Sequence, residues 1–115
     1  ALITDLEDRG LLEQTLVCCL GEFGRSPLIN SAGGRDHWTG CWTVYFAGGG
    51  VQGGRAIGRS DKTGAEPAER PTSVAEITAT VYQGMGVSSR QLPPGFSVND
   101  VPFFETGKQA IPELF

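Results

Sequence analysis

Two short apolar runs constrain the fold of this chain more than any other feature. Residues 15–20 and residues 41–47 consist mainly of aliphatic, cysteine and aromatic side chains. Continuous β-prone runs of this kind are typical of strands that are covered on both faces, as in a parallel sheet. Residues 21–40 connect the two runs, and loops of this length without structure of their own are often functional. We therefore expect two buried strands joined by a functional loop.

Helices are predicted before and after these strands. Apolar residues at helical spacing predict a helix over residues 2–13, with Gly10 as its stop signal. Ser73 and Glu76 have the spacing of a capping box and precede a second stretch with helical periodicity. This pattern predicts a helix over residues 73–84.

The order of these elements predicts an α/β fold: a fragment of a three-layer αβα sandwich with a mainly parallel sheet. A chain of 115 residues makes one domain at most. Two or three strands are too few for a doubly wound domain, so we expect the sheet to need strands from elsewhere. Residues 48–54 fit a plain glycine turn, because the spacing of their glycines is not that of a nucleotide-binding loop. Residues 55–58 predict a short edge strand and residues 59–71 a polar surface loop.

Charge and hydropathy exclude two classes of partner. The net charge is −4 and the nine Lys and Arg residues are scattered. Nucleic acid is therefore not expected as a partner, because phosphate binding needs clustered positive charge. No run approaches the 18 or so apolar residues of a transmembrane helix, so no membrane span is expected. The first residues carry acidic charges, unlike a signal peptide, and no targeting segment is recognised, which leaves the localisation unknown.

The candidate site residues all come from the loop between the two apolar runs: Glu22, Arg25, Arg35, Asp36 and His37. Glu22 follows a strand end, where a carboxylate can ligate a metal or instead pair with Arg25. Asp36 and His37 offer a carboxylate oxygen and an imidazole nitrogen, which suit a divalent metal such as zinc. Arg25 and Arg35 match the geometry of a phosphate or sulfate oxyanion. The alternative is that both arginines are solvated or pair with the neighbouring carboxylates.

We expect these five side chains to converge in one solvent-reachable cleft. The two flanking strands are predicted to run parallel, and ligands of α/β proteins gather at the carboxyl ends of such strands. A purely structural loop would instead scatter the side chains into solvent or into separate ion pairs. Convergence of Glu22 and His37 is the part of this prediction on which a shared metal site depends.

Several ordered motifs of the chain resemble the carboxyl-terminal part of the domain-of-unknown-function family DUF1501. They are EFGRSP at residues 22–27, GRDHW at residues 34–38 and AGGGV at residues 47–51. The likeness extends from residues 6–12 to residues 111–114. That family in turn resembles a sulfatase-like branch of the alkaline phosphatase superfamily. Residues 1–115 are then expected to be the carboxyl-terminal part of a single alkaline phosphatase-like domain.

The resemblance implies a function for the longer parent protein. Enzymes of that superfamily hydrolyse phosphate or sulfate esters with divalent metals, so zinc, manganese or calcium is implied in the parent. By resemblance, His37 matches a metal-binding histidine, and Glu22 stands where the superfamily has the Asp of an Asp-His-Gly motif. Phe23 stands in place of that motif's histidine and cannot bind a metal. The nucleophile lies in the part that would precede this chain, so the isolated chain is expected to be inactive.

A second hypothesis belongs to another functional class. The family would have lost catalysis and would keep the fold as a non-catalytic binding or structural module, which Phe23 at a ligand position favours. Under both hypotheses, the side of the sheet that the missing strands would leave exposed is apolar and must be covered. We therefore expect as partner either the missing amino-terminal part of the domain or a second copy through self-association. The apolar residues 111–115 are expected to dock on a neighbouring surface.

Overall fold

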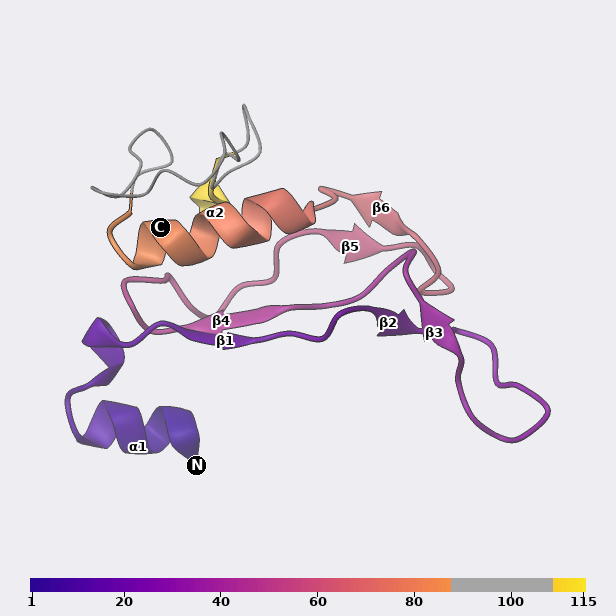
Figure 1. The fold of residues 1–115 in the computed structure, drawn as a ribbon, viewed down its shortest axis with the longest axis horizontal. Coiled ribbons are helices and arrows are strands. Elements are labelled where there is room, and N and C mark those ends of the chain that lie inside the picture. The colour runs from indigo at the N-terminus through magenta and orange to yellow at the C-terminus, as the bar shows by residue number, and fades with distance from the viewer. Residues whose placement is uncertain (88–108) are drawn as a thin grey trace, which may run out of the picture. The chain divides into compact units, whose positions relative to one another are not determined.

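The computed structural model describes residues 1–87 and 109–115 of the chain. These residues fall into two compact units (Figure 1). The first unit comprises Ala1–Val17, Ala47–Gly53 and the described residues of Thr72–Phe115. The second comprises Cys18–Phe46 and Gly54–Pro71. Each unit is held together by different interactions, and the candidate site residues all belong to the second.

The helices lie in the first unit. They are α1 (Leu2–Asp8), the 3₁₀ turn η1 (Leu12–Gln14), α2 (Val74–Gly84) and the 3₁₀ turn η2 (Pro112–Leu114). The second predicted helix is confirmed with its capping box, because the Ser73 side chain accepts from the Glu76 N–H and the Ser73 N–H donates to the Glu76 carboxylate. The first predicted helix is too long, because α1 ends at Asp8.

Glycine ends both helices in the same way. Gly10 and Gly86 have φ angles of +67° and +76°, in the left-handed region that glycine adopts without a steric penalty. Beyond α1, the N–H groups of Gly10 and Leu11 donate to Glu7 and Leu6. The same pair of bonds follows α2, and together these bonds make a Schellman cap at each helix end. The stop signal read at Gly10 is therefore correct, and η1 is a separate turn.

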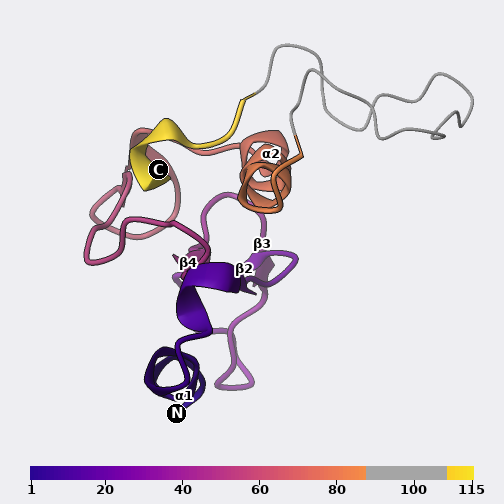
Figure 2. The same cartoon turned by 90° about the vertical axis from the view of Figure 1, so that its left-hand side faces the viewer.

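The core of the first unit lies where the carboxyl-terminal segment meets α2, seen in yellow and orange (Figure 2). Ile111, Leu114 and Ala79 are buried there. Thr80 is fully buried, and its hydroxyl donates to the Glu76 carbonyl and accepts from the Ile111 N–H at 2.9 Å. The expected docking of residues 111–115 is confirmed, and the buried hydroxyl is satisfied on both sides.

The glycine turn predicted after the second apolar run packs on η1. The Gly49 N–H donates to the Leu12 carbonyl at 2.9 Å. Gly48 has φ +69°, and a Cβ there would collide with the carbonyl oxygens of Leu12 and Thr15. The predicted turn is confirmed at residues 48–50. The structure adds that Gly48 permits a close approach of two backbone segments.

The two apolar runs give shorter strands than expected. They are β1 (Val17–Cys19) and β4 (Tyr45–Ala47), and these two strands pair with each other in a two-stranded sheet (Figure 1). None of the six residues is buried, and Cys19 and Tyr45 are exposed. Three-residue strands with open faces differ from the fully covered strands that the continuous apolar runs predicted.

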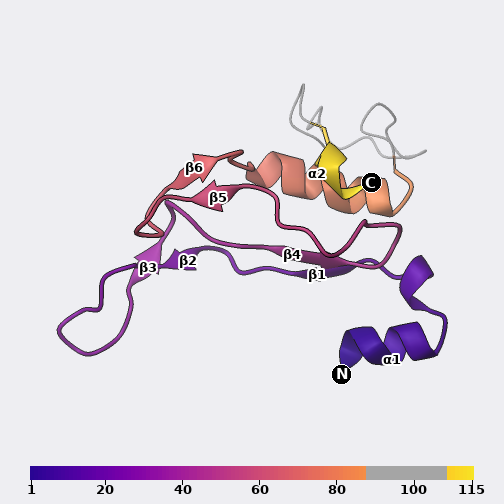
Figure 3. The ribbon, with the colours of Figure 1, turned by 180° about the vertical axis from the view of Figure 1, so that it is seen from behind.

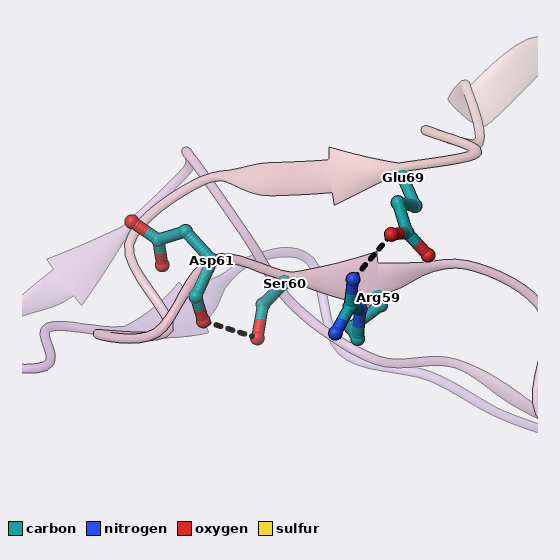
Figure 4. Close-up of polar contacts among 4 residues, drawn as sticks. All are labelled: Arg59, Ser60, Asp61 and Glu69. Atoms are coloured by element: carbon teal, nitrogen blue, oxygen red, sulfur yellow. Dashed lines mark hydrogen bonds and ion pairs between the residues drawn. The ribbon is translucent and has the colours of Figure 1, made fainter.

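The second unit contains two small antiparallel sheets. Strands β2 (Gly24–Arg25) and β3 (His37–Trp38) pair in one, and β5 (Arg59–Ser60) and β6 (Pro67–Glu69) in the other (Figure 3). In the second sheet, Arg59 faces Glu69 across the strands and forms an ion pair with it (Figure 4). The stretches expected to be unstructured loops therefore contain hairpins.

The predicted α/β sandwich with a mainly parallel sheet is wrong for the described residues. They hold two α-helices, and their strands form three separate two-stranded sheets, of which β2–β3 and β5–β6 are antiparallel. The physical reason is that strands of two or three residues cannot build a continuous sheet with two faces for helices to cover. Among the same residues, no helix has both the length and the apolar character required to cross a membrane, in agreement with the sequence.

Candidate functional site

The candidate site is one face of the β2–β3 hairpin. Arg25 and His37 are register partners across the two strands, and side chains directly opposite each other in an antiparallel pair share a face. Phe23 lies in the bend just before β2, and its ring contacts both of these side chains. The ring centroids of Phe23 and His37 are 4.0 Å apart, and the Arg25 guanidinium carbon lies 5.6 Å from the Phe23 centroid. Arg25 and His37 are exposed, and Phe23 is half-buried.

The opposite face of the hairpin is packed. Gly24 is the register partner of Trp38, and the Trp38 indole N–H donates to the Ala65 carbonyl at 2.7 Å. A Cβ at Gly24 would lie 2.9 Å from the Trp42 Cβ and still closer to the Cys41 carbonyl. Glycine is therefore required at position 24 by a close backbone approach, and this packing turns the alternate residues toward solvent.

The loop between β2 and β3 extends from the end of the hairpin (Figure 3) and is ordered by its own polar groups. The Asn30 side-chain oxygen accepts from the N–H groups of Ala32 and Gly34, at 3.0 and 2.9 Å. The Asn30 amide nitrogen donates to the Asp36 carboxylate at 2.9 Å. Asp36 is therefore placed by Asn30, one residue before β3.

Arg35 has a structural role in this loop. Its Nη1 donates to the carbonyls of Ser26 and Pro27, both at 2.7 Å. The Ser26 N–H also donates to the Asp36 carbonyl at 2.8 Å, which continues the hairpin into the loop. Of the two predicted oxyanion-binding arginines, Arg35 thus supports the loop backbone, whereas Arg25 stands on the exposed face beside His37.

Glu22 is the carboxylate just before the hairpin. It is exposed, lies in a bend just before β2, and forms no ion pair with Arg25. Across residues 1–87 and 109–115, no three His, Cys, Asp or Glu side chains are grouped so that they could hold a metal ion. The structure therefore brings Arg25 and His37 together, holds Asp36 through Asn30, and does not form a complete metal centre from Glu22, Asp36 and His37.

One further carboxylate of the unit is strongly hydrogen-bonded. Donation from the Ala65 N–H at 2.8 Å contributes most to lowering the pKa of Asp61, and bonds from Thr63 lower it further, while slight burial acts in the opposite direction. This carboxylate closes the turn between β5 and β6, whose backbone the Trp38 indole contacts at Ala65. Asp61 is thus a structural group of the turn.

Sequence reasoning missed the roles of Phe23 and Asn30. The resemblance to metal-dependent enzymes marks Phe23 only as a residue unable to bind metal, and its contacts with Arg25 and His37 depend on a bend before β2 that the sequence does not indicate. Asn30 stands before Ser31 and a pair of glycines, a composition typical of turns in which an Asn side chain bonds the following backbone. The signal at Asn30 is present in the sequence, whereas the strands of the hairpin are too short to show periodicity.

Comparison with known proteins gives one finding. The profile of the family described as "Protein of unknown function (DUF1501)" matches residues 1–115, the full length of the chain. Neither the curated proteins nor the solved structures contain a match to the chain. The family match agrees with the motifs at residues 22–27 and 34–38, which are the two sides of the β2–β3 hairpin.

Proposed function

The chain belongs to the DUF1501 family, and from that premise we propose that it is the carboxyl-terminal portion of a hydrolase of phosphate or sulfate esters. In this proposal the chain supplies groups that bind the oxyanion of the ester. The observation that carries it is the pairing of Arg25 with His37 on the open face of the hairpin. A guanidinium and an imidazole on one exposed face provide several N–H donors for the tetrahedral oxygens of such an anion.

The two groups have different roles in the proposal. The Arg25 guanidinium donates two parallel hydrogen bonds and carries the charge that balances the oxyanion. The imidazole of His37 donates one N–H hydrogen bond in the plane of its ring. Phe23 contacts the face of that ring, so the two ring nitrogens stay open to a ligand in the plane. Arg35 contributes by holding the carbonyls of Ser26 and Pro27. Only its Nη1 is used in this way among the described residues, so it stays a candidate for the oxyanion too.

A divalent metal in the parent protein belongs to the proposal only in a limited form. Zinc, manganese or calcium would be held there by Glu22, Asp36 and His37 together with ligands from outside the described residues. The residues of this chain do not fit a complete centre by themselves, because they are not grouped for it and Asp36 already accepts from Asn30. The roles proposed for Arg25 and His37 do not depend on a metal. A chain without a complete centre or a nucleophile is expected to be inactive alone.

The oxyanion role is tested by titrating the chain with inorganic phosphate and with sulfate, followed by amide chemical shifts. Arg25→Ala should weaken binding by about tenfold or more, because it removes a charge-assisted hydrogen bond of roughly 1.5–3 kcal/mol. Lys62→Ala is the matched control, since it removes one exposed positive charge from the same unit. Equal affinities of the two variants would refute the role of Arg25. Turnover of p-nitrophenyl phosphate or sulfate by a longer family protein, lost in Arg25→Ala, would extend the result to catalysis.

The second candidate function is a non-catalytic binding or structural module. The internal use of Arg35, Asp36 and Asn30 in ordering the loop favours it. So do the apolar side chains that the loop presents to solvent, Leu28 at 77% and Ile29 at 65% exposure, because such side chains commonly meet a partner. Metal analysis of a longer family protein, with His37→Ala as control, separates the two. Stoichiometric metal lost in the variant supports the hydrolase, and its absence from both proteins supports the module.

A further inference from the structure

Phe23 contacts both groups of the proposed oxyanion site. Its ring centroid lies 4.0 Å from that of His37, with 33° between the ring planes, and 5.6 Å from the guanidinium carbon of Arg25. Because one ring meets both groups, the imidazole and the guanidinium cannot be farther apart than the sum of these two distances. Phe23 is half-buried, whereas Arg25 and His37 are exposed, so packing restrains Phe23 most.

The exposed side chains of Arg25 and His37 have few other restraints. Among the described residues, the Arg25 guanidinium forms no ion pair, and the imidazole has its ring contact with Phe23. A long cationic side chain in solvent samples many rotamers, and a ligand must pay for ordering it. The π face of an aromatic ring attracts a guanidinium and stacks with an imidazole, which restricts both side chains before a ligand arrives.

We propose that Phe23 is the positioning residue of the site, which orders Arg25 and His37 on the open face of the β2–β3 hairpin so that both face one oxyanion. This inference rests on the proposed function of those two residues. It also gives a reason for an aromatic residue at position 23, where the resemblance to metal-dependent enzymes implied a histidine ligand. The site at this position is then built on aromatic contacts rather than on metal coordination.

The test compares four forms of the chain: wild type, Phe23→Leu, Phe23→Tyr and Phe46→Leu. Phe46 is also half-buried and lies on β4, so its replacement by leucine is a matched loss of one aromatic ring. Two quantities are measured for each form by NMR. One is the dissociation constant for inorganic phosphate, and the other is the order parameter of the Arg25 Nε–H bond without ligand.

Phe23→Leu should lower the Arg25 order parameter and weaken phosphate binding by about tenfold, an amount expected for two side chains that must be ordered on binding. Phe23→Tyr should restore both quantities, and Phe46→Leu should change neither. A Phe23→Leu variant that unfolds would be seen in its amide spectrum. The Arg25 order parameter of folded wild type then decides, because a value in the flexible range would overturn the inference.

The possible failures are distinguishable. If wild type binds phosphate and Phe23→Leu binds it equally well, the positioning role is overturned while the oxyanion site stands. If wild type does not bind phosphate, the proposed function is refuted, and the order parameter still decides the positioning of Arg25. An Arg25 order parameter that is the same in wild type and Phe23→Leu overturns the inference whatever the affinity.

Discussion

The carboxyl-terminal segment on α2 and the loop between β2 and β3 are both irregular pieces of chain, but different forces order them. The first is fixed by burial of Ile111 and Leu114 and by one buried hydroxyl, that of Thr80. The second has exposed apolar residues at its tip and is fixed by the side chains of Asn30 and Arg35, which bond the backbone. Burial orders a segment by attaching it to a helix, whereas local hydrogen bonds order a loop that stays open to solvent. The second mode suits a loop that serves binding.

The largest expected effect tests the buried segment. Ile111→Ala should lower the free energy of unfolding by about 2–4 kcal/mol, because it removes a buried aliphatic side chain and leaves a cavity. Ile29→Ala is the control with the same chemical change at a site that is 65% exposed, and it should stay within about 0.5 kcal/mol of wild type. Urea unfolding measures both. Similar losses in the two variants would contradict the contrast between burial and local hydrogen bonding.

An intermediate effect tests the loop. Asn30→Ala removes acceptors for the Ala32 and Gly34 N–H groups and the donor to Asp36. The loop should lose about 1 kcal/mol of local stability, since exposed hydrogen bonds contribute modestly. Hydrogen exchange of the Gly34 amide should therefore accelerate by about fivefold. Ser31→Ala, one residue further along the exposed loop, should leave this rate unchanged, and an unchanged rate in Asn30→Ala would show that the loop is ordered otherwise.

The smallest effect concerns acid. The pKa of Asp61 lies below its ordinary value of 3.8 because the Ala65 N–H bonds its ionised form. The stabilisation from this carboxylate is therefore complete above pH 3.8 and is lost as the pH falls through the lower folded-state pKa. Between about pH 6 and pH 2, the urea midpoint of wild type should fall slightly more than that of Asp61→Asn. A steeper fall in the variant would reverse the sign and contradict the assignment.

The sequence predicts structure well where a few adjacent residues determine the local geometry. The capping box at Ser73 and Glu76 and the glycine ending of each helix were predictable, because cap geometry depends on a few adjacent residues. Docking of residues 111–115 followed from their apolar character alone. The prediction of a parallel sheet was wrong because an apolar run cannot by itself distinguish a covered strand from a short strand with an open face.

For the candidate site, the sequence indicates one loop but does not show which of its side chains lie together. Its residues were identified in one loop, but the hairpin that pairs Arg25 with His37 has strands of two residues, too short to leave a period in the sequence. Arg35 supports the loop by donating to the backbone carbonyls of Ser26 and Pro27. Every residue has such a carbonyl, so no sequence pattern indicates this role. The grouping of Glu22 with Asp36 and His37 presupposed parallel strands, and the antiparallel hairpin removes that reason for it.

The β2–β3 hairpin has one packed face and one open face, and this difference limits how its length can vary within the family. Deleting or inserting a single residue within β2 would exchange the two faces of the strand. Arg25 would turn toward the packed side, and a residue with a Cβ would take the place of Gly24 and collide with the Cys41 carbonyl. Changes of length inside residues 27–35, away from the paired strands, would leave both faces in place. Insertions and deletions among members should therefore collect in that connection and avoid the strands. The open face of the hairpin would thus stay the same among family members while the loop at its end changes in length.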